Sequence, residues 1–176
     1  MAKRNYYINF GNSPDHSLDY LRGIFEDARV TTLQRVESLT VEELHWQYKA
    51  GWNTIGALLS HIISLEHVFR IYFLENRELT EQENNRWEAG LEMGKFIPQL
   101  ITMQPIDTYV AALAESRQML LNSLANLTFD DFSERRKGYD PLTGCNLAWV
   151  LYHLAEDEVH HRGQISILRK LYQANK

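Results

Sequence analysis

Four side chains that bind metals or protons are spaced for one face of a helix near the end of the sequence. They are His153, Asp157, His160 and His161, in the stretch NLAWVLYHLAEDEVHHRGQISI at 146–167. No Pro interrupts this stretch and its apolar residues recur at helical spacing, which predicts one long helix. At 100° per residue, the four side chains fall within a stripe of about 100° around that helix.

The same stripe carries Trp149, Val150 and Gln164, so we expect it to face inward. Two or three imidazoles and a carboxylate are costly to bury without a partner, and a divalent cation is an efficient partner for them. The alternative is a solvated polar face with one hydrogen-bonded core histidine. The stretch alone favours neither interpretation over the other.

A further histidine, His61, lies within the apolar pattern of a second long helix, predicted over 54–76 with Asn53 as its cap. A lone histidine on an apolar face is more often a hydrogen-bonded core residue than a metal ligand. Its neighbours Glu66 and His67 lie further round the helix and are weaker candidates. His61 therefore needs support from other parts of the chain.

Two more long helices are predicted, at 16–38 after a capping sequence at 13–15, and at 105–127 after a starting Pro. The run at 40–43 has the pattern of a capping box and predicts a short helical turn. Residues 76–104 are polar and broken by Gly and Pro. We expect a helical extension there, followed by a long excursion that covers one end of the fold.

Four long amphipathic helices, without an alternating strand pattern or a Gly-rich phosphate loop, predict a four-helix bundle with at least one long crossover. The length predicts a single domain over 1–176. Residues 1–12 form an apolar N-terminal arm that is expected to pack across the bundle or against a second subunit, so we expect a homodimer. Metal sites in such bundles form from side chains that project inward from facing helices.

The net charge of −5 disfavours electrostatic binding to nucleic acid. No run approaches the roughly 18 apolar residues that span a bilayer, and the N-terminus lacks the apolar core of a signal peptide. The single Cys145 cannot form an internal disulfide, and it lies about four and a half turns from His161, too far to share its site. We therefore expect a cytoplasmic protein that binds neither membrane nor nucleic acid.

Three segments resemble the DinB-like superfamily. NTIGALLSHIISLEHVF at 53–69 resembles the second helix of that family, and LTVEELHWQYKAGWNTIG at 39–56 resembles the loop that leads into it. HLAEDEVHHRGQI at 153–165 resembles the signature of its last helix, and the HHRGQ run matches as written. The similarity covers roughly residues 35–75 and 140–173, in the right order and at the right separation.

The resemblance implies an all-α four-helix bundle that holds a divalent metal with three histidines, one on the second helix and two spaced i, i+4 on the last. The matching positions are His61, Asp157 and His161, so an aspartate stands where the family usually has its middle histidine. Two histidines and one carboxylate with open positions can hold Zn²⁺, Ni²⁺, Mn²⁺ or Fe²⁺. His160 or His153 as a replacement ligand, and an empty site, are the alternatives.

Residues next to these positions have simpler roles. Gln164 is a candidate hydrogen-bond donor behind the metal ligands. Gly163, which costs about 1 kcal/mol in a helix relative to Ala, is expected to permit close helix packing. Glu156 and Glu158 are expected to be solvated or paired on the polar face, and His160 is expected to cap or bridge neighbouring helices.

Characterised relatives in the family include bacillithiol and mycothiol S-transferases and a thiol-dependent maleylpyruvate isomerase. The resemblance therefore implies a metal-dependent enzyme, a thiol S-transferase or a hydrolase, that activates a low-molecular-weight thiol or a water toward a small-molecule substrate. The alternative is a non-catalytic, stress-related bundle whose metal site is structural or vacant. A catalytic site leaves a coordination position open, whereas four protein ligands close a structural one.

Overall fold

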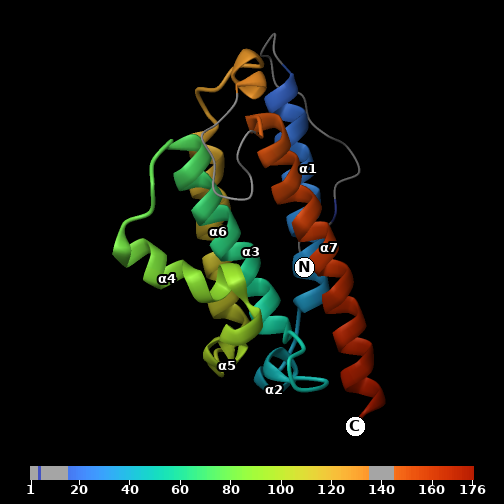
Figure 1. Ribbon diagram of the computed structural model, residues 1–176. Helices are drawn as coiled ribbons and strands as arrows, with labels where there is room; N and C mark the ends of the chain where they lie inside the picture. The colour runs from blue at the N-terminus through green and yellow to red at the C-terminus, as the bar shows by residue number, and fades with distance from the viewer. Residues whose placement is uncertain (1–3, 5–15, 135–144) are drawn as a thin grey trace.

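The computed structural model describes Arg4, residues 16–134 and residues 145–176. Its four long helices are α1 (Ser17–Val36), α3 (Ile55–Phe69), α6 (Ile106–Ser123) and α7 (Leu147–Ala174). α1 packs on α7, α7 on α3, α3 on α6 and α6 on α1, which closes a bundle (Figure 1). The predicted all-α four-helix bundle is confirmed, and the described ranges contain no strand.

Neighbouring helices of the bundle do not simply alternate in direction. In Figure 1, α3 and α6 run the same way, and so do α1 and α7. Parallel neighbours cannot be joined by a tight turn, so the chain has to travel back along the bundle between α3 and α6. That connection holds α4 (Glu81–Glu92), a 3₁₀ turn at Gly94–Phe96 and α5 (Ile97–Leu100), and it is the long crossover that was predicted.

Helix α4 is the main element that the sequence analysis did not predict. The Thr80 side chain accepts a hydrogen bond from the Glu83 backbone N–H at 3.2 Å, and the Glu83 carboxylate accepts one from the Thr80 N–H at 2.9 Å. This is a capping box, the same device that starts α2 (Val41–His45), which was predicted correctly. The Thr-x-x-Glu spacing was the signal that identifies α4 as a separate helix.

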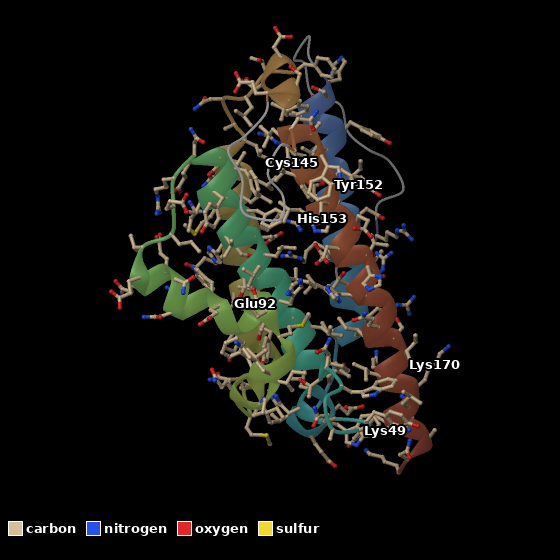
Figure 2. The ribbon with its side chains drawn as sticks, viewed as in Figure 1. Lys49, Glu92, Cys145, Tyr152, His153 and Lys170 are labelled. Atoms are coloured by element: carbon tan, nitrogen blue, oxygen red, sulfur yellow. The ribbon has the colours of Figure 1, made fainter. Side chains whose placement is uncertain are left out.

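Several boundaries differ from the prediction. Thr54, not Asn53, caps α3, because its hydroxyl accepts the Ala57 N–H. The helix continues as a π-helical turn at Arg70–Leu74. Asn146 caps α7 directly after Cys145 (Figure 2). The predicted cap at 13–15 and, apart from Arg4, the predicted N-terminal arm lie outside the described residues.

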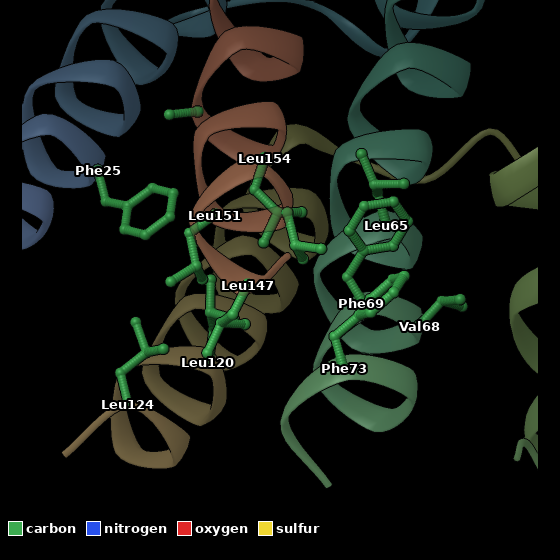
Figure 3. Close-up of a cluster of buried hydrophobic side chains, with 12 residues drawn as sticks. Phe25, Leu65, Val68, Phe69, Phe73, Leu120, Leu124, Leu147, Leu151 and Leu154 are labelled. Atoms are coloured by element: carbon green, nitrogen blue, oxygen red, sulfur yellow. The ribbon is translucent and has the colours of Figure 1, made fainter. Parts of the chain in front are cut away.

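Two apolar clusters form the core. The first, drawn in Figure 3, includes Phe25, Phe69 and Leu120, all at most 2% exposed. The second lies toward α2 and includes Leu44 and Leu113. Burial of these side chains is the main term that holds the four helices together.

A layer of charged groups separates the two clusters. Each bundle helix contributes one or two residues to this layer, four of them charged and one a serine. They are Arg29, Glu66, Ser116, Arg117 and Glu158. Arg29 Nε donates to Glu158 Oε1 at 2.8 Å, and Arg117 Nε donates to Glu66 Oε1 at 2.6 Å. Arg117 also reaches Glu158 Oε2 at 2.6 Å. The two arginines and two glutamates therefore balance one another inside the bundle.

Glu158 was expected on the polar face, and that prediction is wrong. The residue is 1% exposed and lies on the inward face of α7. Burial alone raises the pKa of a carboxyl, but Arg29 and Arg117 reverse this and hold the pKa of Glu158 below its usual value. A buried glutamate is tolerated here because two guanidinium groups pair with it.

The segment Ile55–Leu74 is long and apolar enough to cross a membrane by length and hydropathy, although no such segment was expected. It is the central helix of the bundle, and 78% of its apolar window is buried inside the protein. That burial accounts for its hydropathy and is consistent with a soluble protein.

Candidate metal centre

His61 on α3 meets Asp157 and His161 on α7 where the two helices pack. The Nε2 atom of His61 lies 3.5 Å from Asp157 Oδ2, and the Nε2 atom of His161 lies 3.3 Å from Asp157 Oδ1. The two imidazole rings are 4.8 Å apart, edge to face. All three potential ligand atoms lie within 4.8 Å of one another, so the structure brings together the three residues that the sequence singled out.

Each histidine is held by a hydrogen bond at Nδ1. His61 Nδ1 lies 3.0 Å from the Gly90 carbonyl oxygen, and His161 Nδ1 lies 2.9 Å from Gln164 Oε1. Both partners are acceptors, so Nδ1 is the donor in each ring, and Nε2, which faces Asp157, is the nitrogen left for a metal ion. This is the arrangement that orients a histidine for metal binding through Nε2.

Asp157 has an unsatisfied oxygen at the centre of this group. Its Oδ2 atom is buried and accepts no hydrogen bond from the described residues. A buried acceptor without a partner is costly, and a cation between the carboxylate and the two imidazoles would remove that cost. Ligand atoms at about 2.1 Å from one tetrahedral ion are roughly 3.4 Å apart. The Nε2 atoms of His61 and His161 lie 3.5 and 3.3 Å from the two Asp157 oxygens, and the whole set of ligand atoms lies within 4.8 Å. The residues present therefore fit a metal ion.

The charges of the three groups are coupled. Burial raises the pKa of Asp157, but the neighbouring His161 and His61 side chains outweigh burial and hold that pKa well below its usual value. Burial lowers the pKa of His161, and Asp157, followed by Gln164, reverses this and raises the pKa above its usual value. The carboxylate is therefore ionised, and it strengthens the hold of His161 on a proton with which a metal ion has to compete.

The two alternative histidines on α7 lie outside the group. His153 contacts Glu156 Oε2 at 3.3 Å and stacks on Trp149, with ring centroids 4.9 Å apart (Figure 2). His160 is exposed, and its Nε2 atom accepts a hydrogen bond from the Gln164 amide at 2.9 Å. Trp149 was expected to face inward but is 38% exposed. Only part of the predicted stripe is therefore turned toward the core.

Other candidates on α3 also have separate roles. Glu66 belongs to the buried charged layer, and His67 stacks on Trp87 at 4.1 Å between ring centroids. Burial, followed by the charge of Arg70, lowers the pKa of His67, so it stays a neutral core residue. Cys145 packs against the first apolar cluster. Within the described ranges, the three residues form the one group of His, Cys, Asp or Glu suited to a metal.

Gly90 on α4 is a functional residue that the sequence analysis missed. A Cβ at this position would overlap Ser64 Oγ and lie 2.9 Å from the Ser60 carbonyl oxygen, so only glycine lets α4 come this close to α3. That approach brings the Gly90 carbonyl to His61. Any residue has a backbone carbonyl, so this hydrogen bond to His61 cannot be read from the sequence. The one sequence signal was the glycine itself.

A pocket of about 410 Å³ lies beside the group, between the loop before α3 and the second half of α7. It is lined by Gly51, Trp52, Asn53, Gln164, Ile167 and Leu168. Gln164 links the two features, because its side chain both lines the pocket and accepts the His161 hydrogen bond. The volume is in the range of small-molecule pockets.

The family comparison agrees with this geometry. The family model of the DinB superfamily matches residues 24–165, which include His61, Asp157 and His161 and most of all four bundle helices. A comparison with curated proteins finds no match. Since the match spans most of its length, the chain belongs to the DinB superfamily.

Proposed function

We propose that the protein is a divalent-metal-dependent enzyme in which His61, Asp157 and His161 hold the ion. The observation that carries this proposal is that the Nε2 atoms of two oriented histidines face the Asp157 carboxylate, one of whose oxygens is buried and unpaired. Three ligand groups converge in the described part of the chain, and three protein ligands are the number that leaves a position open for chemistry.

Asp157 shapes which ion the site prefers. A carboxylate between two imidazoles makes a harder and more anionic set than three histidines, and such a set suits Zn²⁺, Ni²⁺, Mn²⁺ or Fe²⁺. When bound, the ion would lower the pKa of a thiol or a water and so supply a nucleophile near neutral pH. Gly90 and Gln164 keep the two imidazole rings in place throughout.

The reaction we favour is transfer of a low-molecular-weight thiol to a small electrophile. The thiol loses its proton to solvent, its sulfur forms a bond to an electrophilic carbon, and the leaving group departs with the bonding electrons. The pocket next to His161 supports this choice, because Trp52 and Ile167 offer apolar walls while Asn53 and Gln164 offer polar groups. We place this activity in the cytoplasm, where such thiols are reduced.

A non-catalytic bundle with a structural or vacant site is the second candidate. It is favoured by the same aspartate, because Asp157 and the two histidines already attract one another at 3.3 and 3.5 Å without any ion. Under this proposal the three residues join α3 to α7 and do no chemistry. Activity measurements separate the two candidates.

The test compares wild type with His161→Ala and with His153→Ala, a histidine on the same helix outside the group. Each protein is loaded with one divalent metal and mixed with a small thiol and an aryl halide. The proposal expects transfer above the uncatalysed rate in wild type and in His153→Ala, and none in His161→Ala. If the wild type binds metal stoichiometrically but transfers no thiol above the uncatalysed rate, the result favours the structural candidate.

A further inference from the structure

One face of α7 is exposed over several turns and carries large apolar side chains. Val159 is 45% exposed and Ile167 is 56% exposed, although the opposite face of the same helix is buried in the bundle. Tyr152, about two turns before Val159 on this face, is also exposed (Figure 2). Isolated apolar residues are common on protein surfaces, but a row of them along one helix is typical of an interaction site.

Gly163 lies at the middle of this face. The sequence predicted that it permits close helix packing, yet a Cβ added there meets no atom of the chain within 4 Å. That prediction is therefore wrong for the described helices of a single copy. Glycine is a poor helix former, and it is used where another backbone approaches closely. A close approach from outside the chain would account for it.

The residues around Gly163 are arranged symmetrically in sequence and complementary in type. Val159 and Ile167 stand four residues before and after it, and Glu156 and Lys170 stand seven residues before and after it. At 100° per residue, all four lie within about 40° of Gly163 around the helix. The face therefore has an acidic end, a basic end and an apolar middle without a side chain at its centre.

We propose that this face is a homodimer interface in which α7 helices of two copies pack antiparallel, with the two-fold axis at Gly163. Under that symmetry, residues equally far before and after the glycine face each other. Val159 packs against Ile167 of the partner subunit, and Glu156 pairs with Lys170 of the partner subunit. Each contact occurs twice, so one helix face is complementary to itself.

The interface does not cover the three candidate metal ligands, and it shares one residue, Ile167, with the wall of the pocket at Gln164. Asp157 and His161 lie about 120° and 160° around α7 from Gly163, so they face the bundle and not the partner. The predicted N-terminal arm lies, apart from Arg4, outside the described residues. Loss of the dimer is therefore expected to leave metal binding intact, and the two proposals fail separately.

Charge reversal tests the register of the pair. Sedimentation velocity over a range of concentrations compares wild type, Glu156→Lys, Lys170→Glu and the double variant. We expect a wild-type dimer, an increase of at least about tenfold in the dissociation constant of each single variant, because like charges then meet twice, and recovery in the double variant. Glu88→Lys, an exposed change on α4, is the matched control and keeps the wild-type value.

Two results would overturn the proposal. One is a wild type that sediments as a monomer at every concentration. The other is a double variant that dimerises no better than the single variants, since that excludes pairing of Glu156 with Lys170 of the partner subunit.

A cross-link tests the axis without relying on charge. In a Cys145→Ser background, Gly163→Cys places two thiols at the two-fold axis, and Glu88→Cys serves as the control. We expect diamide to convert the first variant to a disulfide-linked dimer well before the second. Equal rates of cross-linking in the two variants would contradict an axis at Gly163.

Discussion

At the scale of single residues, the centre depends on which ring nitrogen of each histidine carries the proton. Gly90 and Gln164 accept from Nδ1 of His61 and His161, so both Nε2 atoms face Asp157 and are the nitrogens left for a metal ion. Neither acceptor is a ligand, yet each fixes a ring orientation that the ligand needs. Asp157 supplies the negative charge that balances a cation and also raises the proton affinity of His161.

This coupling predicts how metal affinity depends on pH. A metal has to displace the His161 proton, and the pKa of His161 is raised, so affinity falls as pH drops through that raised pKa, by about tenfold per pH unit for each displaced proton. Asp157 stays ionised over the same range because its pKa is lowered. Titrations with Zn²⁺ between pH 5.5 and 8 measure the slope. An affinity independent of pH would contradict the role of His161.

The metal-free protein is expected to respond in the opposite sense. A raised pKa in the folded state stabilises it at pH below the unfolded value of about 6.5, and this stabilisation is lost as pH rises through the raised value. Chemical denaturation with a chelator present, in wild type and in His161→Ala, measures the difference. The variant should lack this part of the pH dependence.

The three ligand candidates were accessible from the sequence because its resemblance to the DinB-like superfamily singles out His61, Asp157 and His161. Helical spacing alone left His153 and His160 open as well and favoured a core role for His61. Gly90 was not accessible, because a carbonyl oxygen has no residue type. Glu158 was placed wrongly because the prediction gave more weight to its charge than to its angular position on the helix. The arginines that pair with it lie on α1 and α6, and no local pattern connects them to α7.

At the scale of elements, α4 holds the His61 ring in its orientation through the Gly90 carbonyl. Since a Cβ at position 90 would overlap Ser64, Gly90→Ala should push α4 away from α3 and break the hydrogen bond to His61. We expect a loss of metal affinity of about 10- to 100-fold, the range found when such supporting contacts are removed. Calorimetric titration with Zn²⁺ measures it.

The control for that variant is a second change at the contact itself. Ser64→Gly removes the Oγ and Cβ atoms that the new methyl group would meet. The double variant should therefore recover part of the lost affinity. If Gly90→Ala binds metal as tightly as wild type, the hydrogen bond from α4 has no role in the centre.

The buried charged layer makes its own prediction about stability. Glu158→Gln leaves Arg29 and Arg117 facing one remaining carboxylate, and an uncompensated buried charge costs roughly 3–5 kcal/mol. Urea denaturation measures the loss. Asp27→Asn removes one partner of the exposed Arg4–Asp27 pair and should cost far less. Equal losses in the two variants would show that burial of the layer does not matter.

At the scale of the whole molecule, the metal centre joins α3 to α7, and its ligand positions on the two helices are at least 96 residues apart in sequence. Between His61 and Asp157 the chain passes through the crossover and α6. An ion bound there is bound only by the folded protein. At a free metal concentration of 100 times its dissociation constant, the folded state should gain about 2.7 kcal/mol. Thermal unfolding with and without metal measures this, and His161→Ala should show no gain.

The bundle itself could be predicted because its four helices carry clear apolar periods and its last helix a specific signature. The direction of the helices could not, since it depends on the path of the crossover and so on α4. The exposed apolar face of α7 could not be predicted from the sequence for a similar reason. Helical periodicity locates Gly163, but only the packed structure shows that no neighbour lies over it.

The central claim is that His61, Asp157 and His161 hold one divalent ion, and metal analysis of protein purified without a His-tag tests it most directly. Wild type and His153→Ala should each carry close to one metal ion per chain, whereas Asp157→Ala and His161→Ala should carry almost none while remaining folded by circular dichroism. A metal-free wild type that takes up no divalent ion on titration, or an Asp157→Ala variant that retains a full equivalent, would contradict the claim.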